Sequence, residues 1–166
     1  MSDFSPPANG VVVSHATVLP AWLDYNGHMN VAYYLVAFET GIDAYKAVVG
    51  MDLAYIEGTG RSTVALESHI TFQNEAMLDD ALRIETRIVD FDGKRAHIYQ
   101  ELFRGEDLLA TQETLSLSFD TRARKSCRFE DAVAARYRAL VAAQAALPRP
   151  KWLGRAVGIG KGKPAA

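Results

Sequence analysis

Apolar residues recur every three or four positions between residues 31 and 49, the spacing of one face of an α-helix. Gly41 interrupts this segment and Gly50 follows its last apolar position. The pattern therefore predicts a long helix over residues 30–49. Its apolar face consists of Val31, Tyr34, Leu35, Phe38, Ile42, Tyr45 and Val49.

Strand-like segments lie on both sides of this helix. Residues 11–18 are rich in β-branched side chains and end before Pro20. After the helix comes an expected loop with Gly58 and Gly60, followed by alternation of apolar and polar positions, which is typical of half-buried strands. This alternation predicts four strands, over residues 62–72, 82–91, 95–104 and 108–120.

Turn and helix signals complete the pattern. Asp92-Gly93 predicts a two-residue hairpin turn, and a second turn is expected at Gly105. An Ala-rich helix is predicted over residues 129–147, before Pro148. Because hairpins join the four later strands, these strands should be antiparallel, with the long helix packed across one sheet face. We therefore expect an α+β fold in which a curved antiparallel sheet wraps around a long central helix.

Length and composition are consistent with a single globular domain. The chain has 166 residues, of which 49% are hydrophobic and 23% are charged. The expected domain covers residues 11–147, with a lead-in over residues 1–10 and a tail over residues 148–166. The formal net charge of −2 gives no reason to expect a nucleic-acid partner. The apolar runs are too short to span a membrane, and no signal peptide is visible, so a cytoplasmic protein is expected.

Residue types that bind metals are sparse and scattered. A single cysteine, Cys127, excludes an internal disulfide and a cysteine-rich zinc site. His15, His69 and His97 lie on separate predicted strands without metal-ligand spacing, so no metal and no cofactor are expected. A Gly-x-Ser-x-Gly motif is also absent, which argues against a serine hydrolase.

The candidate chemistry is concentrated just before the long helix, in the run Asp24-Tyr25-Asn26-Gly27-His28-Met29-Asn30. A helix N-terminus carries unsatisfied N–H groups that stabilise negative charge, as acyl chemistry requires. Asp24 is a candidate nucleophile or general base for water; the alternative is an ordinary turn aspartate. The backbone N–H groups of Gly27, His28 and Met29 are candidate oxyanion donors. His28 either takes part in the reaction or is a structural histidine, and Asn30 is a natural N-cap.

The same motif, continued to Tyr33-Tyr34 and Glu39, together with Leu66-Glu67-Ser68-His69-Ile70-Thr71-Phe72, resembles the hotdog-fold thioesterases of the 4-hydroxybenzoyl-CoA thioesterase type. The resemblance covers roughly residues 11–125. It implies hydrolysis of an acyl-CoA with the aspartate of the loop, here Asp24, as nucleophile or general base. It also implies that two subunits build the pocket, so a homodimer or homotetramer is expected.

A narrower resemblance is to the betainyl-CoA thioesterases of carnitine breakdown, carried by residues 22–34, residues 66–70 and Lys94-Arg95-Ala96-His97. It implies a betaine acyl group, whose trimethylammonium should be held by aromatic faces and a carboxylate. The candidate substrate-binding residues are Trp22, Tyr25, Asn26, Tyr33, Tyr34 and Glu67. Core packing is the alternative for these aromatic residues, and a solvent-facing strand position is the alternative for Glu67.

Two other functions remain open at this point. One is a hotdog thioesterase for aromatic or medium-chain acyl-CoA that uses the same Asp24. The other is a non-catalytic module that binds an acyl thioester without hydrolysing it.

Overall fold

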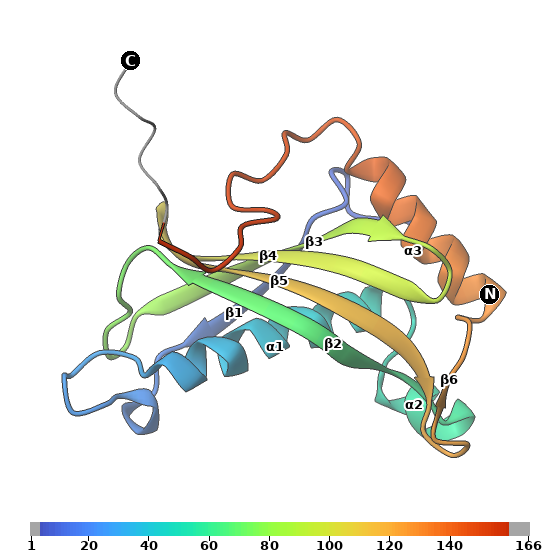
Figure 1. The fold of residues 1–166 in the computed structure, drawn as a ribbon, viewed down its shortest axis with the longest axis horizontal. Coiled ribbons are helices and arrows are strands. Elements are labelled where there is room, and N and C mark those ends of the chain that lie inside the picture. The colour runs from blue at the N-terminus through green and yellow to red at the C-terminus, as the bar shows by residue number, and fades with distance from the viewer. Residues whose placement is uncertain (1–3, 160–166) are drawn as a thin grey trace.

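A computed structural model describes residues 4–159, and residues 1–3 and 160–166 of the expected lead-in and tail lie outside the described part. A curved antiparallel sheet lies over one long helix, α1 (Figure 1). The elements are β1 (Val12–Thr17), η1 (Pro20–Trp22), α1 (Val31–Val48), α2 (Leu53–Thr59), β2 (Arg61–Phe72), β3 (Ala81–Phe91), β4 (Arg95–Arg104), β5 (Asp107–Asp120), β6 (Lys125–Ser126) and α3 (Asp131–Ala143). The predicted α+β architecture is confirmed.

The strands are arranged in the order β1-β3-β4-β5-β2, and β6 pairs with β5. Every neighbouring pair is antiparallel. Helix α1 packs on β1, β3 and β4, which places it toward one side of the sheet. Strand β2 lies at the other side, with β5 as its only partner in the described chain, so one of its edges is free.

Alternation along the strands divides the sheet into two faces. Ile84 of β3 and Leu102 of β4 point toward α1 and are buried around Phe38. Successive side chains of a strand alternate between the two faces, so the intervening residues, such as His97 of β4, point to the outer face. The inner core continues to α3, where the Tyr137 and Tyr45 hydroxyl oxygens are 2.5 Å apart.

Several local predictions differ from the structure. The Ala-rich helix, expected over residues 129–147, is α3 and ends at Ala143, and the short strand β6 was not expected. Residues 53–59, expected as a loop, form α2, because the Asp52 carboxylate accepts the Tyr55 N–H at 2.9 Å and Gly60 ends the helix in a left-handed conformation. The hairpin turn after β3 is centred one residue later than predicted. Asp92 N–H donates to Arg95 O at 3.2 Å, so Gly93 and Lys94 are the two turn residues.

Gly41 sets how closely α1 approaches the sheet. A Cβ atom at this position would lie 2.5 Å from Gln100 Nε2 and 2.7 Å from Thr86 Oγ1. The Gln100 amide is fixed, since it donates to Phe38 O at 2.9 Å and to Thr86 Oγ1 at 3.1 Å. A glycine that weakens the helical pattern in the sequence is therefore the contact point between helix and sheet.

We expect Gly41→Ala to lower the free energy of unfolding by about 1–3 kcal/mol, because the added methyl group must displace a hydrogen-bonded buried amide. The matched control is Gly58→Ala in α2, where a Cβ would meet nothing within 4 Å. Alanine favours a helix over glycine by about 1 kcal/mol, so the control should be neutral or stabilising. Urea denaturation at a fixed protein concentration measures both, and equal stability of the two variants would contradict the close contact.

Candidate active site

The loop between β1 and α1 folds back on itself at Asp24. Leu23 and Met29 form an isolated antiparallel bridge, and Asp24 N–H donates to His28 O at 3.0 Å. Gly27 adopts a φ of 82° in this turn and donates its N–H to Asp24 O at 3.0 Å. The turn therefore places the Asp24 and His28 side chains next to each other, with His28 Nδ1 3.9 Å from Asp24 Oδ1.

A second contact fixes the loop to the segment after β2. Met29 is buried, and its N–H donates to Ala76 O at 2.8 Å. Asn30 N–H donates to Trp22 O at 2.9 Å. The Met29–Ala76 bond places the start of α1 beside the end of β2, and the Asn30–Trp22 bond closes the loop on itself.

A pocket of about 420 Å³ lies where these segments meet. It is lined by Asp24, residues 28–31, Tyr34 and residues 72–75. The volume is within the range of small-molecule sites. Thus Asp24, His28, Met29 and Tyr34, which were predicted from sequence, share one pocket.

Of the two Asp24 carboxylate oxygens, only one accepts a hydrogen bond within the described chain. Its Oδ1 accepts the Asn26 N–H at 2.8 Å, and the side chain is only 15% exposed. Among the described residues no donor is bonded to Oδ2. An oriented, largely desolvated carboxylate with one free oxygen suits attack on an acyl carbon or proton removal from water.

The backbone donors at the pocket differ from those predicted. The Gly27 and Met29 N–H groups are not available as oxyanion donors, because they bond to Asp24 O and Ala76 O as described above. Within residues 4–159, by contrast, the N–H groups of His28 and Val31 have no acceptor. Both residues line the pocket, and Val31 is the first residue of α1. The helix dipole and these two free donors favour negative charge here.

Asn30 fixes this end of the helix. Its side-chain Oδ1 accepts the Ala32 N–H at 3.0 Å, which confirms it as the N-cap. The cap gives the Ala32 N–H an acceptor and leaves the Val31 N–H directed out of the helix.

Tyr34 is the buried wall of the pocket. Its hydroxyl accepts the Ala76 N–H at 3.1 Å and donates to Asn74 O at 3.5 Å. Burial raises the pKa of this hydroxyl above its usual value, and the neighbouring Glu75 carboxylate acts in the same direction. Tyr34 is therefore a neutral, fixed side chain near neutral pH.

Four other predicted substrate-binding residues lie outside this pocket. Trp22 and Tyr33 stack on each other, with ring centroids 5.7 Å apart, and pack against the inner core. Tyr25 is 96% exposed at the tip of the turn, where Asn26 is also exposed. For Trp22 and Tyr33 the core-packing alternative applies.

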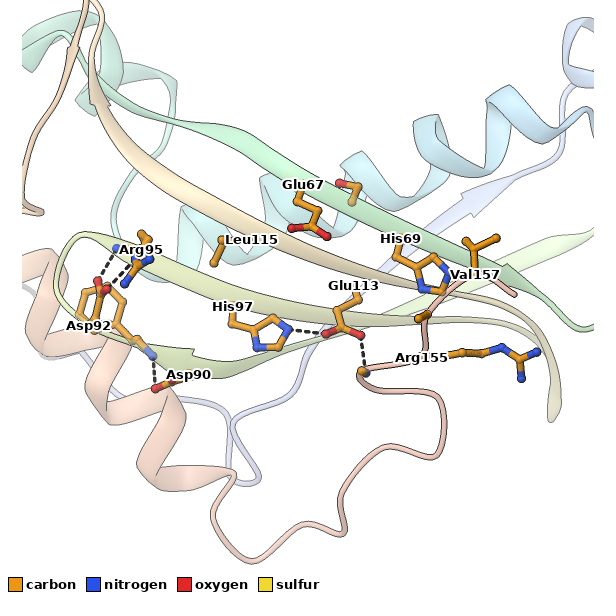
Figure 2. A pocket seen from close by; sticks show the side chains of 14 residues that line it. Glu67, His69, Asp90, Asp92, Arg95, His97, Glu113, Leu115, Arg155 and Val157 are labelled. Carbon is orange, nitrogen blue, oxygen red and sulfur yellow. Dashed lines mark hydrogen bonds and ion pairs between the residues drawn. The ribbon is translucent and has the colours of Figure 1, made fainter. Parts of the chain in front are cut away.

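Glu67 does not line the Asp24 pocket of its own chain, so its predicted place in a pocket built by two subunits stays a prediction. Ser68 bonds Thr114 on the helix side of the sheet, so alternation turns Glu67 to the opposite face. Figure 2 shows Glu67 and His69 on that face, with α1 behind the sheet. They line a larger pocket of about 760 Å³ beside the chain segment of Arg155, and Asp24 is not part of it.

Residues 72–75 were not predicted as site residues. Phe72 was the last residue of the strand motif that resembles the hotdog thioesterases, but it was given no role in a site, and Glu75 belonged to no motif. No local signal marks them, because the pairing of β2 with β5 and the Met29–Ala76 bond bring them to Asp24.

The described residues contain no group of three or more side chains suited to holding a metal ion. They also contain no helix with the length and apolar character that membrane crossing demands.

Comparison with known proteins places this geometry in a family. Residues 18–137 match the sequence model of the Thioesterase-like superfamily. The chain is 36% identical over 144 residues to the betainyl-CoA thioesterase of Pseudomonas aeruginosa, covering 86% of this chain and 91% of the relative. It is also 36% identical over 140 residues to the L-carnitine dehydrogenase/betainyl-CoA thioesterase of Rhizobium meliloti, of which it spans only 28%.

Solved structures share the fold. A Staphylococcus aureus protein in complex with CoA superposes with a TM-score of 0.84 at 24% identity, covering 90% of this chain and 96% of that one. The DHNA-CoA thioesterase of Staphylococcus aureus superposes with a TM-score of 0.74 at 16% identity, covering 80% and 91%. A Pseudomonas putida protein described as a proposed thioesterase is 30% identical, with a TM-score of 0.77 and coverage of 90% and 97%.

The cap at the start of α1 can be tested separately from any reaction. We expect Asn30→Ala to lower the free energy of unfolding by about 1 kcal/mol, since the Ala32 N–H loses its acceptor. Asn30→Asp keeps an acceptor oxygen and should be as stable as the wild type. Urea denaturation of both variants measures the difference. An Asn30→Ala variant with the wild-type free energy of unfolding would show that this cap does not stabilise the helix.

Proposed function

Because this chain belongs to the Thioesterase-like superfamily, we propose that it hydrolyses an acyl-CoA thioester at Asp24, with betainyl-CoA as the substrate. One observation carries the proposal: within residues 4–159, Asp24 Oδ2 and the N–H groups of His28 and Val31 have no hydrogen-bond partner, and all three residues line one pocket. Thioester hydrolysis needs this pair of functions, an activated oxygen and a stabilised oxyanion.

The reaction follows from these positions. The thioester oxygen accepts hydrogen bonds from the His28 and Val31 N–H groups, which stabilise the tetrahedral oxyanion. In the general-base route, Asp24 takes a proton from the attacking water; the C–S bond breaks, and the proton goes to the departing CoA thiolate. In the nucleophilic route, Asp24 attacks the carbonyl carbon and the C–S bond breaks, which gives an acyl anhydride and the CoA thiolate. Water then opens the anhydride to the acid and the Asp24 carboxylate, and the proton released in this step goes to the thiolate. Both routes give the carboxylic acid and CoA, and both need Asp24 ionised.

Betainyl-CoA is the proposed substrate because relatives at 36% identity bear that name. An aromatic or medium-chain acyl-CoA would use the same Asp24 chemistry and differ only in the acyl group. A panel of betainyl-, benzoyl- and octanoyl-CoA separates these substrates. A non-catalytic binding module would hydrolyse none of them.

We further propose that the working unit is at least a homodimer in which a second copy covers the open side of the pocket. β2 has a free edge in the described chain, and exposed apolar side chains extend from it to α1. They are Val64, Leu66, Phe72, Val31, Leu35 and Val36. An unprotected edge of this length and an apolar surface beside it are typical of a surface that binds another chain.

We expect Asp24→Asn to lower kcat for thioester hydrolysis by about 100- to 10,000-fold, because the amide is neither a base nor a nucleophile. The asparagine Oδ1 still accepts the Asn26 N–H, so the fold should be retained. Asp52→Asn is the matched control, since Asp52 also bonds a backbone N–H but belongs to the N-cap of α2. Release of CoA thiol measures the rates. A fully active Asp24→Asn enzyme would refute the proposed role.

For the dimer, light scattering should give a mass of at least twice that of the chain. Leu66→Asp on β2 should raise the dissociation constant at least about tenfold, because a buried unpaired carboxylate costs more than about 1.4 kcal/mol. Val13→Asp on β1 is the control, as Val13 is 46% exposed on the opposite edge strand. A monomeric wild type would contradict the proposal. So would a dimer that dissociates in the Val13→Asp control but not in Leu66→Asp.

A further inference from the structure

The charges that line the Asp24 pocket bear on which acyl group it can bind. Two carboxylates line it, Asp24 and Glu75, and no lysine or arginine is among its lining residues. Within the described chain, Glu75 is exposed and takes part in no ion pair. A neutral acyl chain gains nothing from a second carboxylate, whereas a cationic acyl group gains Coulomb attraction.

Two aromatic rings stand beside Glu75. The Tyr34 and Phe72 rings meet edge to face, with centroids 5.1 Å apart and planes at 84°. The hydrogen bonds of the Tyr34 hydroxyl to the Ala76 N–H and Asn74 O fix its ring, and Phe72, 49% exposed, lines the open part of the pocket. The exposed Phe72 ring offers an aromatic wall to the pocket, and the buried Tyr34 ring holds it in place through the edge-to-face contact. A trimethylammonium has no N–H to donate, so aromatic faces and a nearby negative charge are the groups that recognise it.

We propose that Tyr34, Phe72 and Glu75 form the subsite for a quaternary ammonium at the end of a short acyl chain. This inference rests on the proposed function, because it assigns the acyl end of the same substrate. The quaternary nitrogen of a betainyl thioester is two bonds from the carbonyl carbon, so its subsite must share a pocket with Asp24. Tyr34, Phe72 and Glu75 meet that condition, whereas Trp22, Tyr25, Tyr33 and Glu67 lie outside this pocket.

The test compares betainyl-CoA with 3,3-dimethylbutanoyl-CoA, in which carbon replaces the quaternary nitrogen and the shape is kept. The quantity measured is the ratio of kcat/KM for the two substrates. We expect wild type to prefer betainyl-CoA by about tenfold or more, and Glu75→Gln or Phe72→Leu to reduce this ratio by about tenfold each. Phe72→Tyr keeps the ring and should keep the ratio. Glu57→Gln, an exposed carboxylate on the distant helix α2, should leave it unchanged.

The outcomes separate the two proposals. If wild type prefers betainyl-CoA but Glu75→Gln and Phe72→Leu keep the ratio, the subsite is refuted and the proposed function stands. If wild type hydrolyses both thioesters equally well, the enzyme does not recognise the charge, and both the subsite and the betainyl substrate are refuted. If wild type hydrolyses neither thioester but is active on benzoyl- or octanoyl-CoA, the substrate is wrong while the Asp24 chemistry holds. If none of the four thioesters is hydrolysed, both the proposed thioesterase activity and the subsite are refuted.

Discussion

The close crossing of α1 over the sheet determines where the candidate active site lies. The helix rests on β3 and β4 through Gly41, which leaves no room for a side chain against Gln100 and Thr86. Because α1 is a rigid rod, this contact also fixes the position of its N-terminus, two to three turns away. The Val31 N–H, which has no acceptor in the described part of the chain, is thereby held beside the end of β2, where Asp24 and Glu75 line the same pocket.

A single backbone contact connects the two halves of the site. Met29 N–H bonds Ala76 O, so the loop before α1 and the loop after β2 form one wall. The loop before α1 carries Asp24, for which we propose the reacting role, and the proposed oxyanion donors are the N–H groups of His28 in this loop and of Val31 at the start of α1. The segment at the end of β2 carries Phe72 and Glu75, to which we assign recognition of the acyl group. Under these two proposals, chemistry and specificity come from different parts of the chain, and acyl preference can change without any change in the reacting groups.

The two sheet faces have different surroundings. The inner face holds α1 and the apolar core, and it leads to the Asp24 pocket. The outer face carries Glu67, His69 and the His97–Glu113 pair, in which the side-chain atoms are 2.7 Å apart, and the segment of Arg155 lies beside it (Figure 2). A shift of one position along β2 exchanges these surroundings. For this reason an acid in the middle of a strand, such as Glu67, could not be assigned to the active site from its spacing to the motif.

By itself the sequence determined the local features. Periodicity defined the long helix and the strands, the Asn30 cap was recognisable, and the aspartate motif identified both the loop and the family. Tertiary structure alone decided which N–H groups remain free, which sheet face Glu67 occupies, and that Phe72 and Glu75 meet Tyr34. The physical reason is the range of the interactions. Capping and amphipathic spacing act over a few residues and are written in the local sequence, whereas a pocket joins segments some fifty residues apart through strand pairing and helix packing, which no local pattern encodes.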